Sequence, residues 1–155
     1  MMETAWVVRP YPHGIYRLKE FLMGNIVAIG WPGIGDLSSC KSRDDIKERL
    51  TSHHEYSSPQ SLGQEVGTIY RFIIEMKEKD YVVVPDGPVV YMGEVLSNYI
   101  YDPTLDSDQE GYPHQRRVKW LHNKKAIRRN LLTGRVYDSL KGQQTVFTTY
   151  FEDIE

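Results

Sequence analysis

Residues 35–42, with the sequence GDLSSCKS, come close to the phosphate-binding loop G-x-x-x-x-G-K-S. That loop holds phosphate on backbone N–H groups, and its second glycine keeps them accessible. Here Cys40 occupies the position of that glycine, and its Cβ would obstruct the phosphate. No acidic magnesium ligand follows a hydrophobic strand either. We therefore expect no nucleoside triphosphate site in this segment.

A second near-match involves a pair of carboxylates. Asp86, in a turn, and Glu94, in the apolar segment that follows, approximate the P-D…(D/E)-x-K pattern of metal-dependent nucleases. Leu96 replaces the lysine of that pattern, which steers and activates the attacking water. We therefore expect Asp86 to be a turn residue and Glu94 a strand residue, in a chain that does not cleave nucleic acid by itself.

The histidines and the single cysteine are too dispersed for a metal or nucleophile site. His53 and His54 are adjacent, so they lack the i, i+4 spacing that puts two imidazoles on one side of a metal. No motif places a base beside Cys40. The other histidines are His13, His114 and His122. The sequence predicts no metal, no cofactor and no enzymatic activity of this chain alone.

Aromatic residues are the more informative group. The chain has 11 tyrosines and three tryptophans. Trp31 follows an apolar segment directly and lies between Gly30 and the Pro-Gly pair 32–33, which is typical of a fixed loop. Aromatic side chains presented from loops can hold a flat ring by stacking, worth ~1–3 kcal/mol per base. Further loop aromatics are Tyr99, Tyr101 and Tyr112, for which packing on the edge of the core is the alternative; Trp6 and Trp120, inside expected strands, are assigned to the core.

Charge is unevenly distributed along a chain of net charge −2. Residues 111–137 contain no Asp or Glu, although an acidic loop with Asp102, Asp106, Asp108 and Glu110 precedes them. A local positive field of this kind suits a phosphate backbone, and a solvated helix face beside an edge strand is the alternative. The cations of this segment are Arg116, Arg117, Lys119, Lys124, Lys125, Arg128, Arg129 and Arg135.

Length and composition fit one domain: 155 residues, 40% hydrophobic and 26% charged. No apolar run is long enough to cross a bilayer, and the first residues lack the basic and apolar regions of a secretion signal. With one cysteine no internal disulfide can form, so we expect a cytoplasmic protein.

Periodicity and turn signals predict strands mixed with helices, an α+β or barrel-like domain. The expected strands are 5–9, 26–29, 81–84, 89–95, 118–121 and 145–150; the expected helices are 15–23, 42–50 and 59–76, with a basic helix or turn at 126–132.

In order along the chain, these pieces resemble the EVE branch of the PUA-like superfamily, which is related to YTH domains. More narrowly, the chain is similar to the EVE-like N-terminal domains of modification-dependent restriction proteins of the Mrr and McrB kind. The matching pieces are AWVVR at 5–9, IVAIGW at 26–31, GDLS at 35–38, Gly67, YRF at 70–72, KEKDYVV at 77–83, YMGEV at 91–95, YPH at 112–114, RVKWL at 117–121, SL at 139–140 and TVF at 145–147.

This resemblance implies a single EVE/PUA-like domain over residues 1–155, a barrel-like mixed sheet of five or six strands flanked by helices. It also implies an aromatic cage for one flipped, modified base, with Trp31 as the first wall and Tyr99, Tyr101 or Tyr112 as the second. Pro32 and Gly33 would complete the loop, and Asn98 or Asp102 would read the edge of the base. Phosphate contacts would come from Arg116, Arg117, Lys119, Lys124, Lys125, Arg128 and Arg129.

The expected function is therefore recognition of DNA that carries a modified, methylated base. A nuclease or NTP-driven partner, on another domain or subunit, would perform the cleavage. An RNA-binding PUA-like domain and a small-ligand or protein-interaction module remain the alternatives. Whether the chain is the N-terminal part of a longer restriction protein also remains open.

Overall fold

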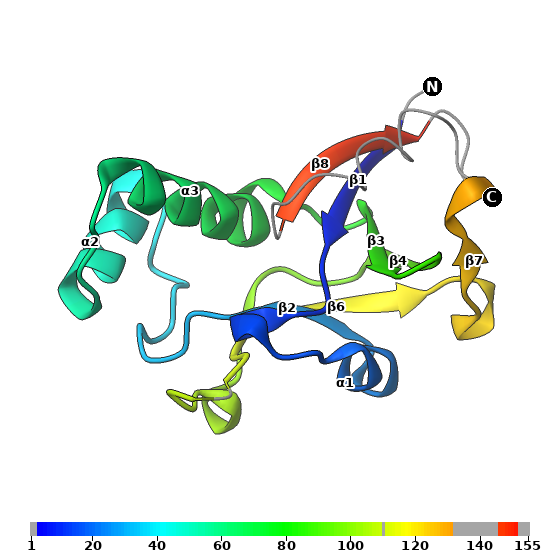
Figure 1. The fold of residues 1–155 in the computed structure, drawn as a ribbon, viewed down its shortest axis with the longest axis horizontal. Coiled ribbons are helices and arrows are strands. Elements are labelled where there is room, and N and C mark those ends of the chain that lie inside the picture. Colours follow the sequence, from blue (N-terminus) through cyan, green and yellow to red (C-terminus); the bar gives the residue numbers. More distant parts are fainter. Residues whose placement is uncertain (1–2, 110, 132–145, 152–155) are drawn as a thin grey trace.

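A computed structural model describes residues 3–109, 111–131 and 146–151, and its main feature is one curled, mixed sheet (Figure 1). The strands on its main path lie in the order β2-β6-β4-β3-β1-β8, while β5 pairs with β6 and β7 with β4. The expected α+β class, with a barrel-like sheet and flanking helices, is confirmed. The strands are β1 (Glu3–Val8), β2 (Ile26–Ile29), β3 (Tyr81–Asp86), β4 (Val89–Val95), β5 (Ile100–Tyr101), β6 (His114–Trp120), β7 (Ile127–Arg128) and β8 (Val146–Phe151).

Three α-helices accompany the sheet: α1 (Leu18–Gly24), α2 (Arg43–His53) and α3 (Pro59–Tyr70). The last continues into a π-helical turn over Arg71–Glu75. Ser42 and Ser58 cap the N-termini of α2 and α3 by accepting backbone N–H bonds. The pair α2–α3 lies at one end of the molecule and β7 at the other (Figure 1). Within the described ranges, no helix has the length and apolarity needed to cross a bilayer.

Local turns shift several boundaries from their expected positions. A short 3-10 turn over Pro12–Gly14, with His13 at φ 56°, delays the start of α1. The strand β6 begins four residues earlier than expected because His114 and Gln115 pair with β2 and β5. The basic helix or turn is the short strand β7 followed by a 3-10 turn over Arg129–Leu131. Leu132, Arg135, the SL pair at 139–140, Thr145 and Glu110 lie outside the described residues.

The pairing of β2 with β6 positions the end of β2. The two strands run antiparallel, with Ile29 opposite His114. The loop that begins at Gly30 therefore starts beside His114, although 84 positions separate residues 30 and 114 in the sequence. The Cα of Gly30 also lies against the backbone of His13, because a Cβ at this position would be 2.6 Å from the N atom of His13. Only glycine permits this close approach, which fixes the root of the loop.

Trp6 and Trp120 lie in the core, as expected. Their exposed fractions are 3% and 7%. Each indole N–H has a partner: Trp6 donates to Asp80 Oδ2 at 2.9 Å, and Trp120 donates to the carbonyl of Phe21 at 3.1 Å. Both rings therefore bury large apolar areas without leaving a donor unpaired.

Arg116 is also part of the core, which contradicts its expected role as a phosphate contact. Its side chain is 1% exposed, and its guanidinium donates to the carbonyls of Ser97, Phe72 and Met76 at 2.7–3.0 Å. Burial lowers the pKa of Arg116 to about 10, although the group remains charged at neutral pH. Along β6, Arg116 faces inward while Arg117 faces solvent. Arg116 thus ties β6 to the π-helical turn after α3.

We predict that Arg116→Met destabilises the fold by about 3 kcal/mol, because three buried carbonyls lose their donor. Arg117→Met, at the adjacent exposed position, is the matched control and should change stability by less than about 0.5 kcal/mol. Urea unfolding of both variants measures the difference. Equal midpoints for the two variants would contradict the structural role of Arg116.

Candidate functional site

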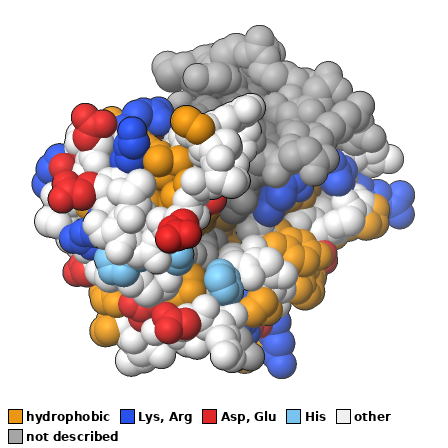
Figure 2. All heavy atoms as spheres, turned by 60° about the vertical axis from the view of Figure 1, so that its left-hand side comes forward, with side chains coloured by type: hydrophobic (Ala, Val, Ile, Leu, Met, Phe, Trp, Pro, Cys, Tyr) orange, Lys and Arg blue, Asp and Glu red, His pale blue; other side chains and the backbone are white. Residues whose placement is uncertain are grey.

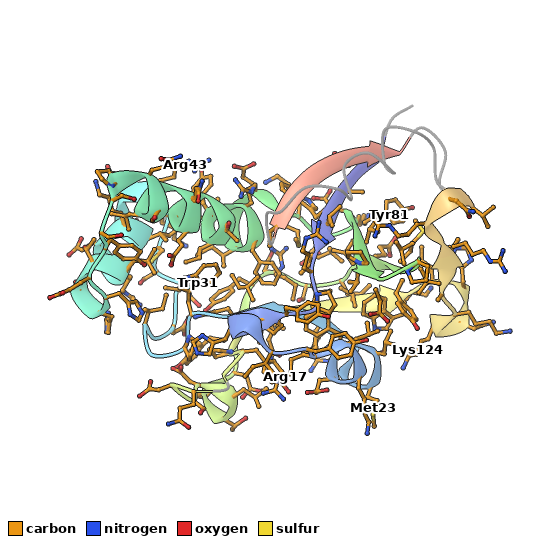
Figure 3. The ribbon with its side chains drawn as sticks, in the orientation of Figure 1. Arg17, Met23, Trp31, Arg43, Tyr81 and Lys124 are labelled. Atoms are coloured by element: carbon orange, nitrogen blue, oxygen red, sulfur yellow. The ribbon has the colours of Figure 1, made fainter. Side chains whose placement is uncertain are left out.

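A pocket of about 830 Å³ lies beside Trp31. Three of the residues expected at the site, Trp31, Pro32 and Gly33, line it from the loop after β2. Other lining residues are 53–57, from the last residue of α2 into the segment before α3, and Glu65 on α3. Trp31 is half-buried and lies between the helical pair and the end of β2 (Figure 3). Its ring is therefore a wall of a cavity and not a sealed core residue.

Glu65 joins the two aromatic walls of this pocket. The indole N–H of Trp31 donates to Glu65 Oε1 at 2.5 Å, and the hydroxyl of Tyr56 donates to the same oxygen at 3.0 Å. Burial and the nearby carboxylate raise the pKa of Tyr56, so its hydroxyl remains a donor at neutral pH. One carboxylate oxygen thus fixes the orientation of a tryptophan and a tyrosine on separate elements.

The backbone of Trp31 has a conformation that few non-glycine residues adopt. Its φ is 58°, in the left-handed region, where a bulky residue costs about 1–3 kcal/mol. The carbonyl of Trp31 accepts a hydrogen bond from His114 Nε2 at 3.0 Å, and the N–H of Gly33 donates to Asp106 Oδ1 at 2.7 Å. These bonds hold the loop from both sides and stabilise the unusual backbone.

His114 belongs to a directed chain of hydrogen bonds behind the pocket. A carbonyl can only accept, so Nε2 of His114 carries the proton that it donates to Trp31. Nδ1 is then the acceptor for the hydroxyl of Tyr99 at 2.6 Å, and that hydroxyl accepts from the N–H of Leu37 at 3.2 Å. His114 is fully buried, and burial lowers its pKa, so the imidazole is neutral at pH 7.

The other aromatic candidates do not line this pocket. The hydroxyl of Tyr99 donates to Nδ1 of His114, and the hydroxyl of Tyr101 donates to the carboxylate of Asp106. Tyr112 is 9% exposed, with the guanidinium of Arg17 4.8 Å from its ring centroid. The aromatic residue that faces the pocket together with Trp31 is Tyr56, which was not among the expected residues.

The two polar candidates for reading a base edge also lie elsewhere. Asn98 lines a second hollow of about 370 Å³, together with Tyr99 and Lys41. Asp102 caps a 3-10 turn, where its Oδ1 accepts from the N–H of Thr104 at 3.0 Å. In the pocket itself, Glu65 is the polar group bonded to the ring walls. Its position could have been noticed in the sequence, because it falls on the apolar stripe of Leu62, Val66 and Ile69.

The pocket is acidic and contains histidine. Glu55, Glu65 and Asp108 line it, together with His13, His53 and His54. Figure 2, which brings the α2–α3 end forward, shows histidines near the middle of this face, with acidic side chains around them and basic side chains toward its edges. Three carboxylates in one lining disfavour a phosphate group and favour a ligand that offers hydrogen-bond donors or positive charge.

The exposed cations that were expected to contact phosphate do not line the pocket. Arg117 and Lys119 alternate outward on β6, and Lys124, Lys125 and Arg128 follow near β7. Lys124 and Trp31 lie toward opposite ends of the molecule (Figure 3). The basic end also carries tyrosines: Tyr11 and Tyr16 are 52% and 46% exposed, and their ring centroids are 5.2 Å apart.

A hairpin connects these tyrosines to the basic residues. Asp86, the last residue of β3 before the β3–β4 turn, lies beside Tyr16, and burial together with a hydrogen bond to Asp86 raises the pKa of Tyr16. At the same turn, Arg129 donates from its guanidinium to the carbonyl of Gly87 at 3.1 Å, and Arg128 pairs with Val89. The tyrosine pair and the arginines therefore belong to one surface around the β3–β4 turn.

The chain belongs to a protein family described as a domain of unknown function, DUF8426, whose model matches residues 15–148. No curated protein and no solved structure matches the chain. Residues 15–148 contain the loop of Trp31, both helices of the pocket and the basic residues of β6 and β7.

The buried His114 should make stability depend on pH. Its folded-state pKa is lowered, so the unfolded chain binds a proton that the folded chain does not. The free energy of unfolding should therefore decrease as the pH falls below about 6.5, the ordinary histidine value. His114→Gln has an amide that can donate to Trp31. Its free energy of unfolding should change less than that of wild type between pH 7.5 and 5.5.

His54→Gln, at an exposed position that also lines the pocket, is the control, and it should keep the wild-type pH profile. Urea unfolding at each pH measures the three curves. Identical slopes for wild type and His114→Gln would contradict a buried, neutral imidazole.

Proposed function

We propose that this member of the family is a DNA-recognition module that holds one flipped, modified base in the Trp31 pocket. The observation that carries this proposal is the half-buried indole of Trp31, which lines a pocket of about 830 Å³. Its N–H donates to Glu65, and the backbone carbonyl of Trp31 accepts from His114. An immobilised flat ring beside an open cavity is suited to stacking on another flat ring. The proposal keeps Trp31 as the first wall and makes Tyr56 the second.

The energetics of base flipping fit such a pocket. Removing a base from its stack costs a few kcal/mol, and stacking on an aromatic side chain returns ~1–3 kcal/mol per base. A methyl group on the base adds ~0.8 kcal/mol if its carbon is buried. The methyl group alone therefore provides only about fourfold discrimination, since a factor of ten needs about 1.4 kcal/mol, and polar contacts to the ring must supply the rest.

The pocket is acidic and the surface near β7 is basic, so the proposal gives the two ends of the molecule different roles. A nucleobase is neutral, so it can enter a pocket lined by Glu55, Glu65 and Asp108, where a phosphate would be repelled. Phosphates are better matched to the exposed cations on β6 and near β7. Tyr11 and Tyr16 add an exposed aromatic pair to that surface. The proposed phosphate contacts are Arg117, Lys119, Lys124, Lys125, Arg128 and Arg129.

The proposal assigns cleavage to a separate nuclease or NTP-driven domain or subunit. A recognition module needs only to bind its modified base and to present the duplex to that partner. The same fold could act on RNA, and binding measurements with both nucleic acids distinguish the two.

A second candidate function is supported by the same lining. Aromatic side chains together with carboxylates also bind methylated ammonium groups through cation–π attraction. Trp31, Tyr56 and the acidic residues of the pocket provide that combination. A ligand of this kind would make the chain a small-ligand or protein-interaction module.

The Trp31 pocket can be tested directly. Titration with a duplex carrying one 5-methylcytosine, with the unmodified duplex and with RNA of the same sequence should show preference for the modified duplex. Trp31→Ala should weaken binding of the modified duplex about tenfold or more and remove that preference, because the stacking wall is lost. Trp31→Phe, which keeps an aromatic face but loses the bond to Glu65, should retain part of it.

Other outcomes favour the alternatives. Tighter binding of RNA than of either duplex would favour the RNA-binding function. Binding of N-trimethyllysine by wild type but not by Trp31→Ala, with no nucleic-acid binding, would favour the small-ligand function.

The basic end predicts a separate effect on salt dependence. The triple variant Lys124→Ala/Lys125→Ala/Arg128→Ala should lower the slope of log K against log salt by about 2–3, since each lost phosphate contact contributes ~0.9. The triple variant should leave the ratio of the affinities for the modified and the unmodified duplex unchanged, because base contacts are not altered. Lys47→Ala, exposed on α2, is the control and should keep the wild-type slope. An unchanged slope in the triple variant would place the phosphate contacts elsewhere.

A further inference from the structure

Glu65 has one carboxylate oxygen that is fully used and one that is not. Oε1 accepts from the indole of Trp31 and from the hydroxyl of Tyr56. Among the described residues, none donates a hydrogen bond to Oε2. Glu65 also lines the pocket, so Oε2 is the oxygen available to a ligand seated between the two rings.

We propose that Glu65 Oε2 makes the pocket selective for a base with an exocyclic amino group, of the cytosine or adenine class. This inference rests on the proposed function, because it concerns the ring that Trp31 would stack on. A carboxylate offers only acceptors, so it matches the N4 amino group of cytosine or the N6 amino group of adenine.

Thymine and uracil present the opposite chemistry at the same place. Their O4 is an acceptor where cytosine carries its amino donor. Their single N–H on the pairing edge lies between two carbonyl oxygens, so a carboxylate that reaches it also meets an acceptor. A polar group built to bond a substrate donor discriminates strongly against a ring that lacks the donor.

Two hydrogen bonds hold the carboxylate of Glu65 in one orientation. Its Oε1 is held by two donors that come from different elements, the loop after β2 and the segment between α2 and α3. The carboxylate plane is therefore fixed relative to the indole face, and Oε2 stays at one place in the pocket. Ser57 and Ser61 also line the pocket, and their hydroxyls can donate to the ring-nitrogen acceptor beside the amino group on the same base edge.

The test compares two single-stranded DNA oligonucleotides that differ only at a central 5-methylcytosine or thymine. Both rings carry the same methyl group, and single strands remove the cost of opening a base pair. Wild type should bind the 5-methylcytosine strand about tenfold more tightly, the lower part of the range for one good base contact. This comparison does not depend on the folding of any variant.

Glu65→Gln gives the second measurement. Its amide oxygen can still accept from Trp31 and Tyr56, while its amide nitrogen now donates where Oε2 accepted. The preference for 5-methylcytosine should disappear or reverse toward thymine, whose O4 accepts that bond. Glu48→Gln, exposed on α2 and outside the pocket lining, should keep the wild-type ratio. The thermal unfolding midpoint of each variant shows that it is folded.

The outcomes separate this inference from the function on which it rests. Equal binding of both strands by wild type, with both weakened by Trp31→Ala, would overturn the selectivity of Glu65 and leave the base pocket intact. Binding of neither strand, or binding that Trp31→Ala does not change, would overturn the proposed function itself. A ratio of about ten that Glu65→Gln removes and Glu48→Gln keeps would support both.

Discussion

The hydrogen bond from the buried imidazole of His114 to the carbonyl of Trp31 fixes the loop on which the candidate site depends. Trp31 has a left-handed backbone that would not persist without such support. The support begins in the sheet, because pairing of β2 with β6 places Ile29 opposite His114. The position of the indole in the pocket is thus a consequence of strand register and of one neutral histidine, whose tautomer Tyr99 reinforces.

The distribution of charge follows from the same topology. Strand β6 begins at His114, beside the pocket, and ends at Trp120, toward the basic end. Its outward side chains between these points are Arg117 and Lys119. One strand therefore connects an acidic hollow with a basic, tyrosine-bearing surface. In the function proposed above, the acidic hollow takes the neutral ring and the basic surface takes the phosphates.

Much of the fold could be predicted from the sequence, and the site only in part. Periodicity and turn signals predicted α2, α3, the β3–β4 hairpin and β2, because these signals are local. The loop Gly-Trp-Pro-Gly at 30–33 predicted that Trp31 is presented from a turn, and the structure places it in a pocket lining. Tyr56 and Glu65 were not expected, since they reach Trp31 only through the packing of α2 and α3. Arg116 was misassigned because its charge was weighed above the alternation of β6, whose inward positions include it.

The place of β1 in the sheet has a consequence for how the chain is made. This strand comes from the N-terminal part of the chain, yet it lies between two partners, β3 in parallel and β8 in antiparallel pairing. During synthesis, its backbone groups on the β8 side have no partner until residues 146–151 leave the ribosome. Until then, β1 is an open edge to which a strand from another molecule can add. A nascent or shortened chain is therefore exposed to aggregation at its first strand, and addition of β8 closes that edge.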